Sequence, residues 1–215
     1  MNGRNYSSLL VFGGTFDPPH IAHLVLPLRA AEVLGLEAVA YVPAANPPHK
    51  HGQPRSSAAH RLAMLRLALA EAPNAVILTD ELDRAAKRPA QPSYTVDTLT
   101  VLRERLGPGV RMRLLIGADQ LRIFPTWRQW RRVVELAEPV VMLRPPQTRA
   151  GLWGSLPGEL RRAEWESRLV DLPQMEISAT EIRRRVARGL GIGGLVHPQV
   201  ADYVRRWGLY RGNRR

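Results

Sequence analysis

The sequence has no cysteine, almost no lysine and no long run of apolar residues. Without cysteine among its 215 residues, the chain can form no disulfide framework and can use no thiolate as a nucleophile. No apolar run is long enough to span a bilayer, and no basic-then-apolar leader opens the sequence. We therefore expect a cytoplasmic protein with no membrane partner, long enough to form one α/β domain with a full core.

The net charge is strongly positive, but it comes almost entirely from arginine. The formal charge is +12, and Lys50 and Lys87 are the lysines. Such a charge by itself suggests a nucleic acid or another polyanion as partner. The arginines are mostly dispersed, however, and no aromatic residues alternate with them as they would in a base-stacking surface. We expect no nucleic-acid partner, and a positive field that helps to attract small phosphate compounds.

Apolar strand patterns alternate with helical patterns along the chain. The patterns predict strands at 9–12, 38–42, 76–78, 112–116, 140–143 and 170–172, and helices at 21–34, 58–71, 94–106, 128–137, 178–188 and 198–207. Loops or irregular structure are predicted at 44–57, 84–92 and 147–169. This alternation indicates right-handed βαβ units and a parallel sheet.

The most informative segment is 13–23, which reads GGTFDPPHIAH and directly follows the first predicted strand. In an open α/β sheet, ligands bind at the carboxyl end of such a strand. Gly13 and Gly14 allow the backbone to approach a ligand closely. Pro18 or Pro19 is suited to begin the following helix, where a missing N–H costs nothing. The segment is therefore predicted to be a ligand-binding turn between the first strand and the first helix.

Two histidines in this segment point to phosphate. His20 and His23 are three residues apart and so share one face of the first helical turn, where we expect His20 to be exposed. Imidazoles beside the N–H groups of a helix start favour an anion. Two histidines are too few ligands for zinc, and Asp17 is the one carboxylate close by, so we expect no protein-held metal. The segment also lacks the dinucleotide fingerprint and the Walker A pattern.

A second phosphate-binding candidate begins at Ser178. The pattern from Ser178 to Glu181 is a capping box that any helix could use. The same helix start also presents the hydroxyl of Thr180 and the guanidinium of Arg183 to an anion. The two interpretations are compatible, because one hydroxyl can cap the helix and its neighbours can bind phosphate.

The motif G-G-T-F-D-P-x-H-x-x-H at 13–23 resembles that of the nucleotidyltransferases that share the HxGH loop with class I aminoacyl-tRNA synthetases. Within that superfamily the chain looks like a bacterial nicotinate mononucleotide adenylyltransferase. The further matching segments are Pro47 to Lys50, Pro92 to Thr95, Ile116 to Asp119, Phe124 to Trp127, Ile177 to Arg183 and Gly208 to Tyr210. The resemblance runs from about Leu9 to Tyr210, with the motifs in the same order.

The resemblance implies a Rossmann-like three-layer nucleotidyltransferase fold with a central parallel sheet and a small helical C-terminal subdomain. We expect a single domain over 1–215, with a core at about 8–146 and a phosphate-binding helical part at about 176–210. It further implies adenylyl transfer from ATP to nicotinate mononucleotide. Mg²⁺ would be bound mainly through the ATP phosphates. The oligomeric state is not implied.

The family motifs also assign residues to roles. The catalytic groups, which would neutralise phosphate charge, are His20, His23, Lys50 and Arg183. The ATP site would comprise Gly13, Gly14, Thr15, Phe16, His20, His23, Gly117, Asp119, Ile177, Ser178, Thr180 and Arg183. The mononucleotide site would comprise His49, Tyr94, Thr95, Asp119, Trp127 and Arg128.

Within that second site, Trp127 would stack on the nicotinate ring and Thr95 would help to bind its carboxylate. Asp119 is placed for ribose hydroxyls. Without the resemblance, Trp127 reads as a core aromatic residue and the start of the 94–106 helix as an ordinary cap. Arg128 stands where relatives often carry an aromatic residue, so that side of the pocket differs.

Two other functions remain open from the sequence. One is a sister enzyme acting on nicotinamide mononucleotide, phosphopantetheine or glycerol phosphate, and the P-S-Y-T and F-P-T-W segments disfavour it. The other is a basic nucleic-acid-binding module or a fragment of a tRNA synthetase. No KMSKS-like lysine motif supports this second reading.

Overall fold

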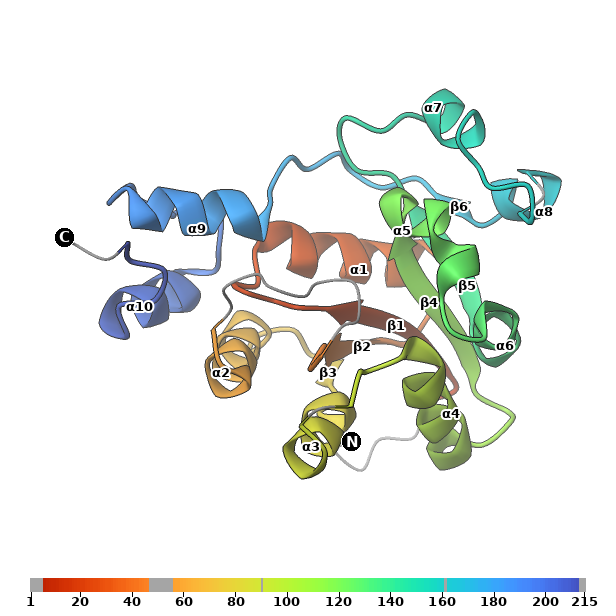
Figure 1. Ribbon diagram of the computed structural model, residues 1–215, viewed down its shortest axis with the longest axis horizontal. Helices are drawn as coiled ribbons and strands as arrows, with labels where there is room; N and C mark the ends of the chain where they lie inside the picture. Colours follow the sequence, from red (N-terminus) through yellow and green to blue (C-terminus); the bar gives the residue numbers. More distant parts are fainter. Residues whose placement is uncertain (1–5, 47–55, 90, 161, 213–215) are drawn as a thin grey trace.

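The computed structural model describes residues 6–46, 56–89, 91–160 and 162–212. Its strands form one parallel sheet in the order β3-β2-β1-β4-β5-β6 (Figure 1). The strands are β1 (Ser8–Gly14), β2 (Ala38–Pro43), β3 (Ala75–Ile77), β4 (Arg111–Gly117), β5 (Glu138–Met142) and β6 (Leu169–Val170). The predicted parallel sheet is confirmed.

Helices connect the strands and follow the last one. They are α1 (Ile21–Val33), α2 (Ala58–Ala68), α3 (Asp80–Lys87), α4 (Thr95–Leu106), α5 (Ala118–Arg122), the 3₁₀ helix η1 (Phe124–Thr126), α6 (Trp130–Leu136), α7 (Arg149–Trp153), α8 (Arg162–Glu166), α9 (Ala179–Ala187) and α10 (Pro198–Arg206). None of the helices in the described ranges is both long and apolar enough to cross a bilayer.

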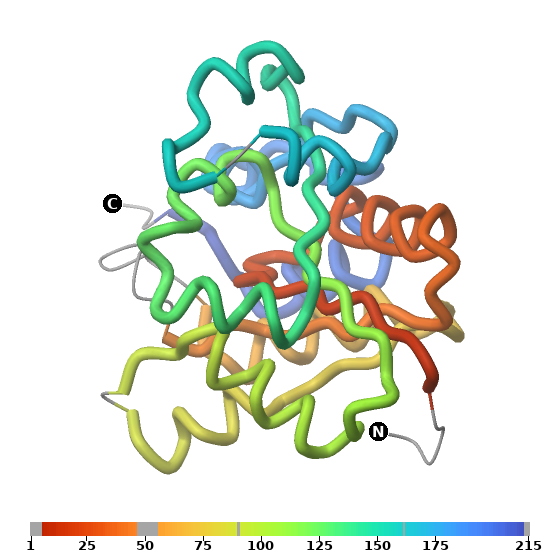
Figure 2. The backbone as a smooth tube through the Cα atoms, turned by 90° about the vertical axis from the view of Figure 1, so that its right-hand side faces the viewer, coloured from red at the N-terminus to blue at the C-terminus, as the bar shows by residue number. Residues whose placement is uncertain are grey.

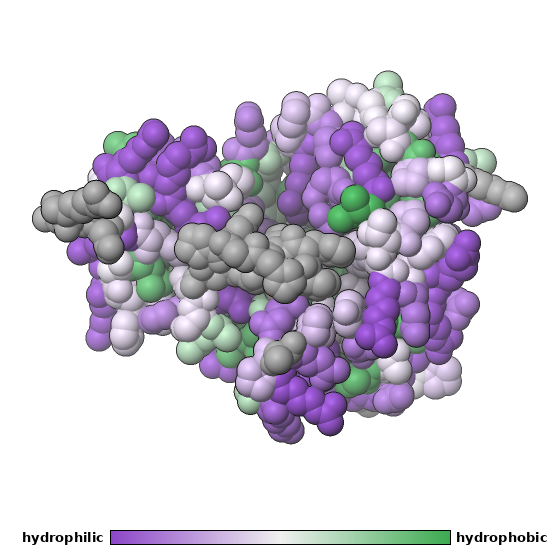
Figure 3. Space-filling model, in the orientation of Figure 1, coloured by the Kyte–Doolittle hydropathy of each residue, from purple (hydrophilic) through white to green (hydrophobic). Residues whose placement is uncertain are grey.

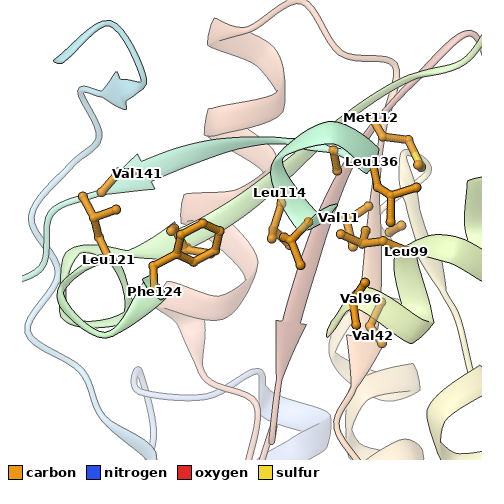
Figure 4. Packing of buried hydrophobic residues seen from close by; sticks show 14 of the residues in the cluster. Val11, Val42, Val96, Leu99, Met112, Leu114, Leu121, Phe124, Leu136 and Val141 are labelled. Atoms are coloured by element: carbon orange, nitrogen blue, oxygen red, sulfur yellow. The ribbon is translucent and has the colours of Figure 1, made fainter. Parts of the chain in front are cut away.

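Alternate residues of the strands serve two different cores. Val11 and Leu114 belong to a cluster with Leu99 of α4 and Leu136 of α6 (Figure 4). The neighbouring residue Leu10 belongs to a second cluster, together with residues of α1 and α2. The strands are continuous apolar runs because both faces of the sheet are covered. The fold therefore has the three layers expected of a Rossmann-like protein.

The C-terminal helices have a core of their own. Ile182 of α9 and Val200 of α10 are fully buried with Met64 of α2 in a third cluster. Figure 1 shows α9 and α10 side by side, next to α2, at one side of the sheet. Figures 1 and 2 both place α7 and α8 on the opposite side of the molecule from α3. The expected helical C-terminal part is present.

The secondary structure departs from the prediction in three places. Residues 80–87 form helix α3, so the loop predicted from 84 to 92 is wrong over its first part. The helix predicted at 128–137 starts later, at Trp130, and α5 and η1 precede it. The stretch 147–169, predicted to be irregular, contains α7 and α8. Most of the predicted loop at 44–57 lies outside the described residues.

The order of the strands fixes the position of the ligand site. Strand β1 pairs with β2 on one side and with β4 on the other. The connections from β1 and β4 therefore leave the sheet in different directions at its carboxyl edge, which is where open α/β sheets bind ligands. The segment 13–23 lies at this switch point.

Candidate active site

A cavity of about 890 Å³ opens at the carboxyl ends of β1 and β4. It is lined by every predicted site residue that the structure describes: Gly13, Gly14, Thr15, Phe16, His20, His23, Tyr94, Thr95, Gly117, Asp119, Trp127, Arg128, Ile177, Ser178, Thr180 and Arg183. The predicted contacts of His49 and Lys50 lie outside the described residues. Figure 3 shows that hydrophilic residues dominate the face of the molecule seen in that view, with apolar residues in separate spots.

The glycine-rich turn is shaped around Phe16. Phe16 has a φ of 51° and its ring lies against Gly14, where a β-carbon would be 2.8 Å from the ring. Only glycine permits this approach. The ring of Phe16 is 1% exposed and meets the ring of His23 edge-on at 5.2 Å. Although Phe16 is part of the cavity lining, it is almost fully buried and its ring packs against His23.

Helix α1 begins at Ile21, as predicted for the helix at 21–34, with His20 as its N-cap. Neither Pro18 nor Pro19, although suited to begin a helix, is part of it. The backbone N–H of His20 donates to Nδ1 of His23 over 3.3 Å. The two imidazole rings stack with centroids 3.6 Å apart. This bond and the stacking fix both rings at the helix start.

His20 is buried, contrary to expectation, and it is uncharged. Its side chain is 5% exposed. Burial, and after it the positive charge of Arg144, lowers the pKa of His20 from its usual 6.5 to about 3. At neutral pH His20 is therefore a neutral hydrogen-bonding group in the free protein, and the expectation that it brings a positive charge has to be revised.

This pKa predicts how acid affects stability. Between pH 6.5 and pH 3 the unfolded chain binds a proton at this histidine and the folded protein does not. The contribution of neutral His20 is thus complete above pH 6.5 and is lost as the pH falls toward 3. At pH 5 the loss is about 2 kcal/mol. We expect His20→Gln to show that much less acid destabilisation than wild type in denaturant titrations at pH 7.5 and 5. Equal acid sensitivity of the two proteins would contradict the buried neutral state.

The start of α9 combines a helix cap with an arginine that reaches the glycine-rich turn. The hydroxyl of Ser178 accepts from the N–H of Glu181 over 3.2 Å, which confirms the cap. Nη2 of Arg183 donates to the hydroxyl of Thr180 over 3.2 Å. Nη1 of Arg183 donates to the carbonyl oxygen of Asp17 over 2.8 Å. The guanidinium therefore joins the first turn of α9 to the glycine-rich turn.

The other side of the cavity has aromatic and donor groups. The guanidinium of Arg128 lies over the ring of Tyr94, 4.8 Å from its centre. Trp127 packs on Phe124 at 5.1 Å, yet it also lines the cavity. Its Nε1–H is buried with no hydrogen-bond partner among the described residues. A buried donor without a partner is costly, so this one suits an acceptor on a ligand.

Ser93 has a different role from helix capping. Helix α4 starts at Thr95, with Tyr94 as an N-cap that makes no side-chain cap bond. The N–H of Ser93 donates to the carbonyl of Asn46 over 3.0 Å, which ties the segment to the loop after β2. At the start of α4, the N–H groups of Asp97 and Thr98 donate to the carbonyl oxygen of Tyr94 over 3.2 and 3.4 Å. The Thr95 hydroxyl, which lines the cavity, is therefore the donor that this helix start offers to a ligand.

Arg144 is a site residue that the sequence did not reveal. It follows β5, whose Met142 pairs with Gly117 of β4, and it lines the cavity. Its Nε is buried without a hydrogen-bond partner among the described residues. Burial lowers the pKa of Arg144, and the negative charge of Asp119 opposes that shift. Arg144 thus adds a cation that interacts electrostatically with both His20 and Asp119.

Glu81 is a second missed residue, and it comes from the unpredicted helix α3. It is 8% exposed and accepts from the hydroxyl of Thr98 over 2.9 Å. Its other oxygen accepts from the N–H of Ala45 over 3.4 Å. Arg84 donates to the same Thr98 hydroxyl over 2.8 Å. These bonds connect α3 and α4 to the loop after β2.

In the described part of the chain, no three His, Cys, Asp or Glu residues come together as a metal site. One cavity carboxylate, Asp17, already accepts hydrogen bonds from Tyr210 at 2.6 Å and from the N–H of Ser56 at 3.2 Å. Asp119 accepts from the side chain of Gln120 over 2.9 Å. Asp17 and Asp119 thus each bind their own hydrogen-bond donors.

A parallel sheet with a glycine–histidine turn and a capped helix start at its switch point defines a nucleotide-binding transferase. Residues 11–185 match the family model described as cytidylyltransferase-like, and the chain belongs to that family. Individual relatives of the chain carry a more specific name than the family model does. A probable nicotinate-nucleotide adenylyltransferase of Chromobacterium violaceum is 40% identical over 94% of this chain and 97% of that protein. One of Thermomicrobium roseum is 41% identical over 95% of this chain and 92% of that protein. Within the family, the chain belongs with the nicotinate-nucleotide adenylyltransferases.

Solved structures confirm the fold. Nicotinic acid mononucleotide adenylyltransferase of Plasmodium falciparum, in complex with NaAD, superposes with a TM-score of 0.71 at 17% identity. The match covers 95% of this chain and 98% of that one. The same enzyme in complex with APC gives a TM-score of 0.70. The predicted Rossmann-like architecture is therefore that of known adenylyltransferases.

Proposed function

We propose that the protein transfers the adenylyl group of ATP to nicotinate mononucleotide. The products are nicotinate adenine dinucleotide and pyrophosphate, as a step of NAD biosynthesis. The observation that carries this proposal is the composition of the cavity. One side gathers phosphate-binding groups from the 13–23 turn and the start of α9, and the other side gathers Tyr94, Thr95 and Trp127. With ATP as a substrate, we place the protein in the cytoplasm.

The reaction needs alignment more than it needs acid–base chemistry. A phosphate oxygen of the mononucleotide attacks the α-phosphorus of ATP, and the bond from that phosphorus to the pyrophosphate oxygen breaks. The nucleophile is already an anion at neutral pH, so no side chain has to remove a proton. The protein contributes positioning and charge stabilisation. Arg183 and Arg144 supply positive charge, and neutral His20 supplies a hydrogen bond.

An Mg²⁺ ion in this cavity would be bound mainly through the phosphates of ATP, with few contacts to the described side chains. Asp17 is engaged by Tyr210 and Ser56, and no described cluster forms a cage for a metal. Mg²⁺ usually keeps water ligands and is bound through substrate phosphates and one or two carboxylates. Bound in this way, it would neutralise the leaving pyrophosphate. The predicted contribution of Lys50 to the same charge stays a prediction.

The mononucleotide side suits a carboxylate better than an amide. Trp127 offers a flat ring and a buried N–H without a partner, and Arg128 adds a positive charge. Thr95 adds a hydroxyl at the start of α4. Donors on all sides satisfy a carboxylate, but they face the NH₂ group of nicotinamide with further donors. One or two mismatches give about 10- to 10⁴-fold discrimination in kcat/KM.

The test is pyrophosphate release from ATP with a set of acceptors. These are nicotinate mononucleotide, nicotinamide mononucleotide, phosphopantetheine and glycerol 3-phosphate. We expect the nicotinate compound to give the highest kcat/KM. Equal efficiency with the nicotinamide compound would refute the nicotinate assignment and leave adenylyl transfer intact. Release with none of the acceptors would refute the enzyme assignment.

Two variants test which residues distinguish nicotinate mononucleotide from nicotinamide mononucleotide. Trp127→Ala is expected to weaken both mononucleotides, because stacking is indifferent to the ring substituent. Thr95→Val is expected to weaken the acid more than the amide and so to narrow the ratio of their kcat/KM values. Thr100→Val, on the same helix but outside the cavity lining, is the matched control. A Thr95→Val enzyme with the wild-type ratio would remove Thr95 from substrate selection.

A further inference from the structure

The side chain of Asp17 is held by two segments that are distant in sequence. Its Oδ1 accepts from the hydroxyl of Tyr210 over 2.6 Å. Both carboxylate oxygens accept from the backbone N–H of Ser56, which directly precedes α2 and its N-cap, at 3.3 and 3.2 Å. Asp17 is 2% exposed, so water offers little competition for these bonds.

The backbone of the same residue holds Arg183. The carbonyl oxygen of Asp17 accepts from Nη1 of Arg183 over 2.8 Å. His20 follows three residues after Asp17, at the start of α1. Any displacement of Asp17 therefore moves both the acceptor of Arg183 and the turn that leads into His20.

The hydroxyl of Tyr210 is the hydrogen-bond donor in its contact with Asp17. Burial, together with the negative charge of Asp17, raises the pKa of the Tyr210 phenol well above its usual value, so the hydroxyl keeps its proton. The backbone of Tyr210 has a φ of 62°, in the left-handed region that non-glycine residues rarely adopt. The hydroxyl also lies 3.9 Å from the sulfur of Met64 on α2. The surroundings thus hold this side chain in one orientation.

We propose that Asp17 and Tyr210 form a clasp that positions the turn carrying His20 relative to Arg183 for phosphate chemistry. This inference rests on the proposed function. Tyr210 is a positioning residue in it, because it acts through Asp17 and does not touch the substrate. Loss of the phenol hydroxyl leaves the Asp17 carboxylate with the N–H of Ser56 alone and lets the turn shift. A displacement of about 1 Å in such a site can cost as much as 10²-fold in rate.

The experiment compares two tyrosine-to-phenylalanine variants. Tyr210→Phe removes the hydroxyl of the clasp. Tyr203→Phe is the matched control, because its hydroxyl bonds to Nδ1 of His60 over 2.9 Å and neither residue lines the cavity. Each variant loses one hydrogen bond of the C-terminal region to α2 or to the turn. We expect similar decreases in Tm, but a kcat about tenfold lower in Tyr210→Phe alone, with the mononucleotide KM changed less than about twofold.

Asp17→Ala tests the other half of the clasp, because alanine has no side-chain acceptor for the Tyr210 hydroxyl. We expect it to lower kcat at least as much, and the double variant Asp17→Ala/Tyr210→Phe to fall little below Asp17→Ala, because both changes break the same contact. The proposal is overturned if Tyr210→Phe keeps the kcat of Tyr203→Phe. If Tyr210→Phe does not fold, Asp17→Ala with wild-type kcat overturns it.

The experiments distinguish between an incorrect proposed function and an incorrect proposal for the Asp17–Tyr210 clasp. A wild-type protein that is inactive with every acceptor refutes the proposed function. ATP affinity, measured by calorimetry, then takes the place of kcat. We expect it to be several-fold weaker in Tyr210→Phe than in Tyr203→Phe, and equal affinities overturn the clasp.

Discussion

Replacing His20 with alanine is expected to lower kcat about a hundredfold or more, which is the usual loss when one preorganised group at a charged transition state is removed. His20 is fixed by its stacking on His23, 3.6 Å away, and by its place as the N-cap of α1. His20 therefore does not have to move in order to stabilise the negative charge that develops in the transition state. As a neutral group it acts through a hydrogen bond, so we expect the mononucleotide KM to change far less than kcat.

His60→Ala is the control for this measurement. His60 also lies on a helix and also contacts aromatic rings, those of Tyr203 and Trp207, but it lies outside the cavity lining. We expect it to keep the wild-type kcat. Because His20 is buried, circular dichroism and Tm have to show that His20→Ala is folded before its rate is interpreted. A folded His20→Ala protein with near-normal kcat would remove His20 from the mechanism.

The second large effect is expected at Arg144. Arg144→Met removes a partly buried cation while keeping most of the side-chain volume, and we expect kcat/KM for ATP to fall about 10- to 100-fold. Arg144→Lys should recover part of this loss, since it restores the charge without the planar guanidinium. Removing the charge also removes the second cause of the lowered pKa of His20. An NMR titration should therefore show the pKa of His20 rising in Arg144→Met.

Arg113→Met is the matched control. Arg113 is a partly buried arginine of β4 that pairs with Glu138 over 2.9 Å, away from the cavity. We expect it to leave both kcat/KM and the pKa of His20 unchanged. If Arg144→Met behaves like Arg113→Met in both measurements, Arg144 has no part in the site.

The sheet and the main elements of the site could be predicted because their signals are local. Strands such as 9–12 and 112–116 are continuous apolar runs, and the turn 13–23 follows one of them directly. The family motifs grouped the turn with Gly117 and Asp119, and the parallel strands explain why they line one cavity, because the carboxyl ends of such strands meet at one edge of the sheet. The cap at Ser178 is equally local, since it depends on residues three positions apart.

Helix α3 was missed although its sequence carries a signal. Its first turn contains Asp80, Glu81 and Asp83 and its last turn Arg84 and Lys87, which complements the helix dipole. The prolines that follow made the same stretch resemble a loop. The helices α5, α7 and α8 have five residues each, too few to show a periodic pattern.

Arg144 lies in none of the matching motifs, and the motif that ends at Tyr210 does not say what Tyr210 contacts, because both contacts join residues that are distant in sequence. Arg144 is one arginine among many, and it gains its place through the pairing of β5 with β4. Tyr210 meets Asp17 across 193 residues of sequence. No spacing rule encodes contacts of that kind. The buried state of His20 was missed for the same reason, since the surrounding fold creates it.

The large sequence separation between Asp17 and its partners also has a consequence for how the protein folds during its synthesis. Ribosomes make Asp17 early, and they make its partners Arg183 and Tyr210 only 166 and 193 residues later. The strands of the sheet are complete by residue 170, so the sheet can form while the phosphate side of the cavity still lacks α9. Domains fold as the chain emerges during translation, and a ligand stabilises only the state that binds it. ATP can therefore protect the finished protein, but the nascent sheet has to be stable without it.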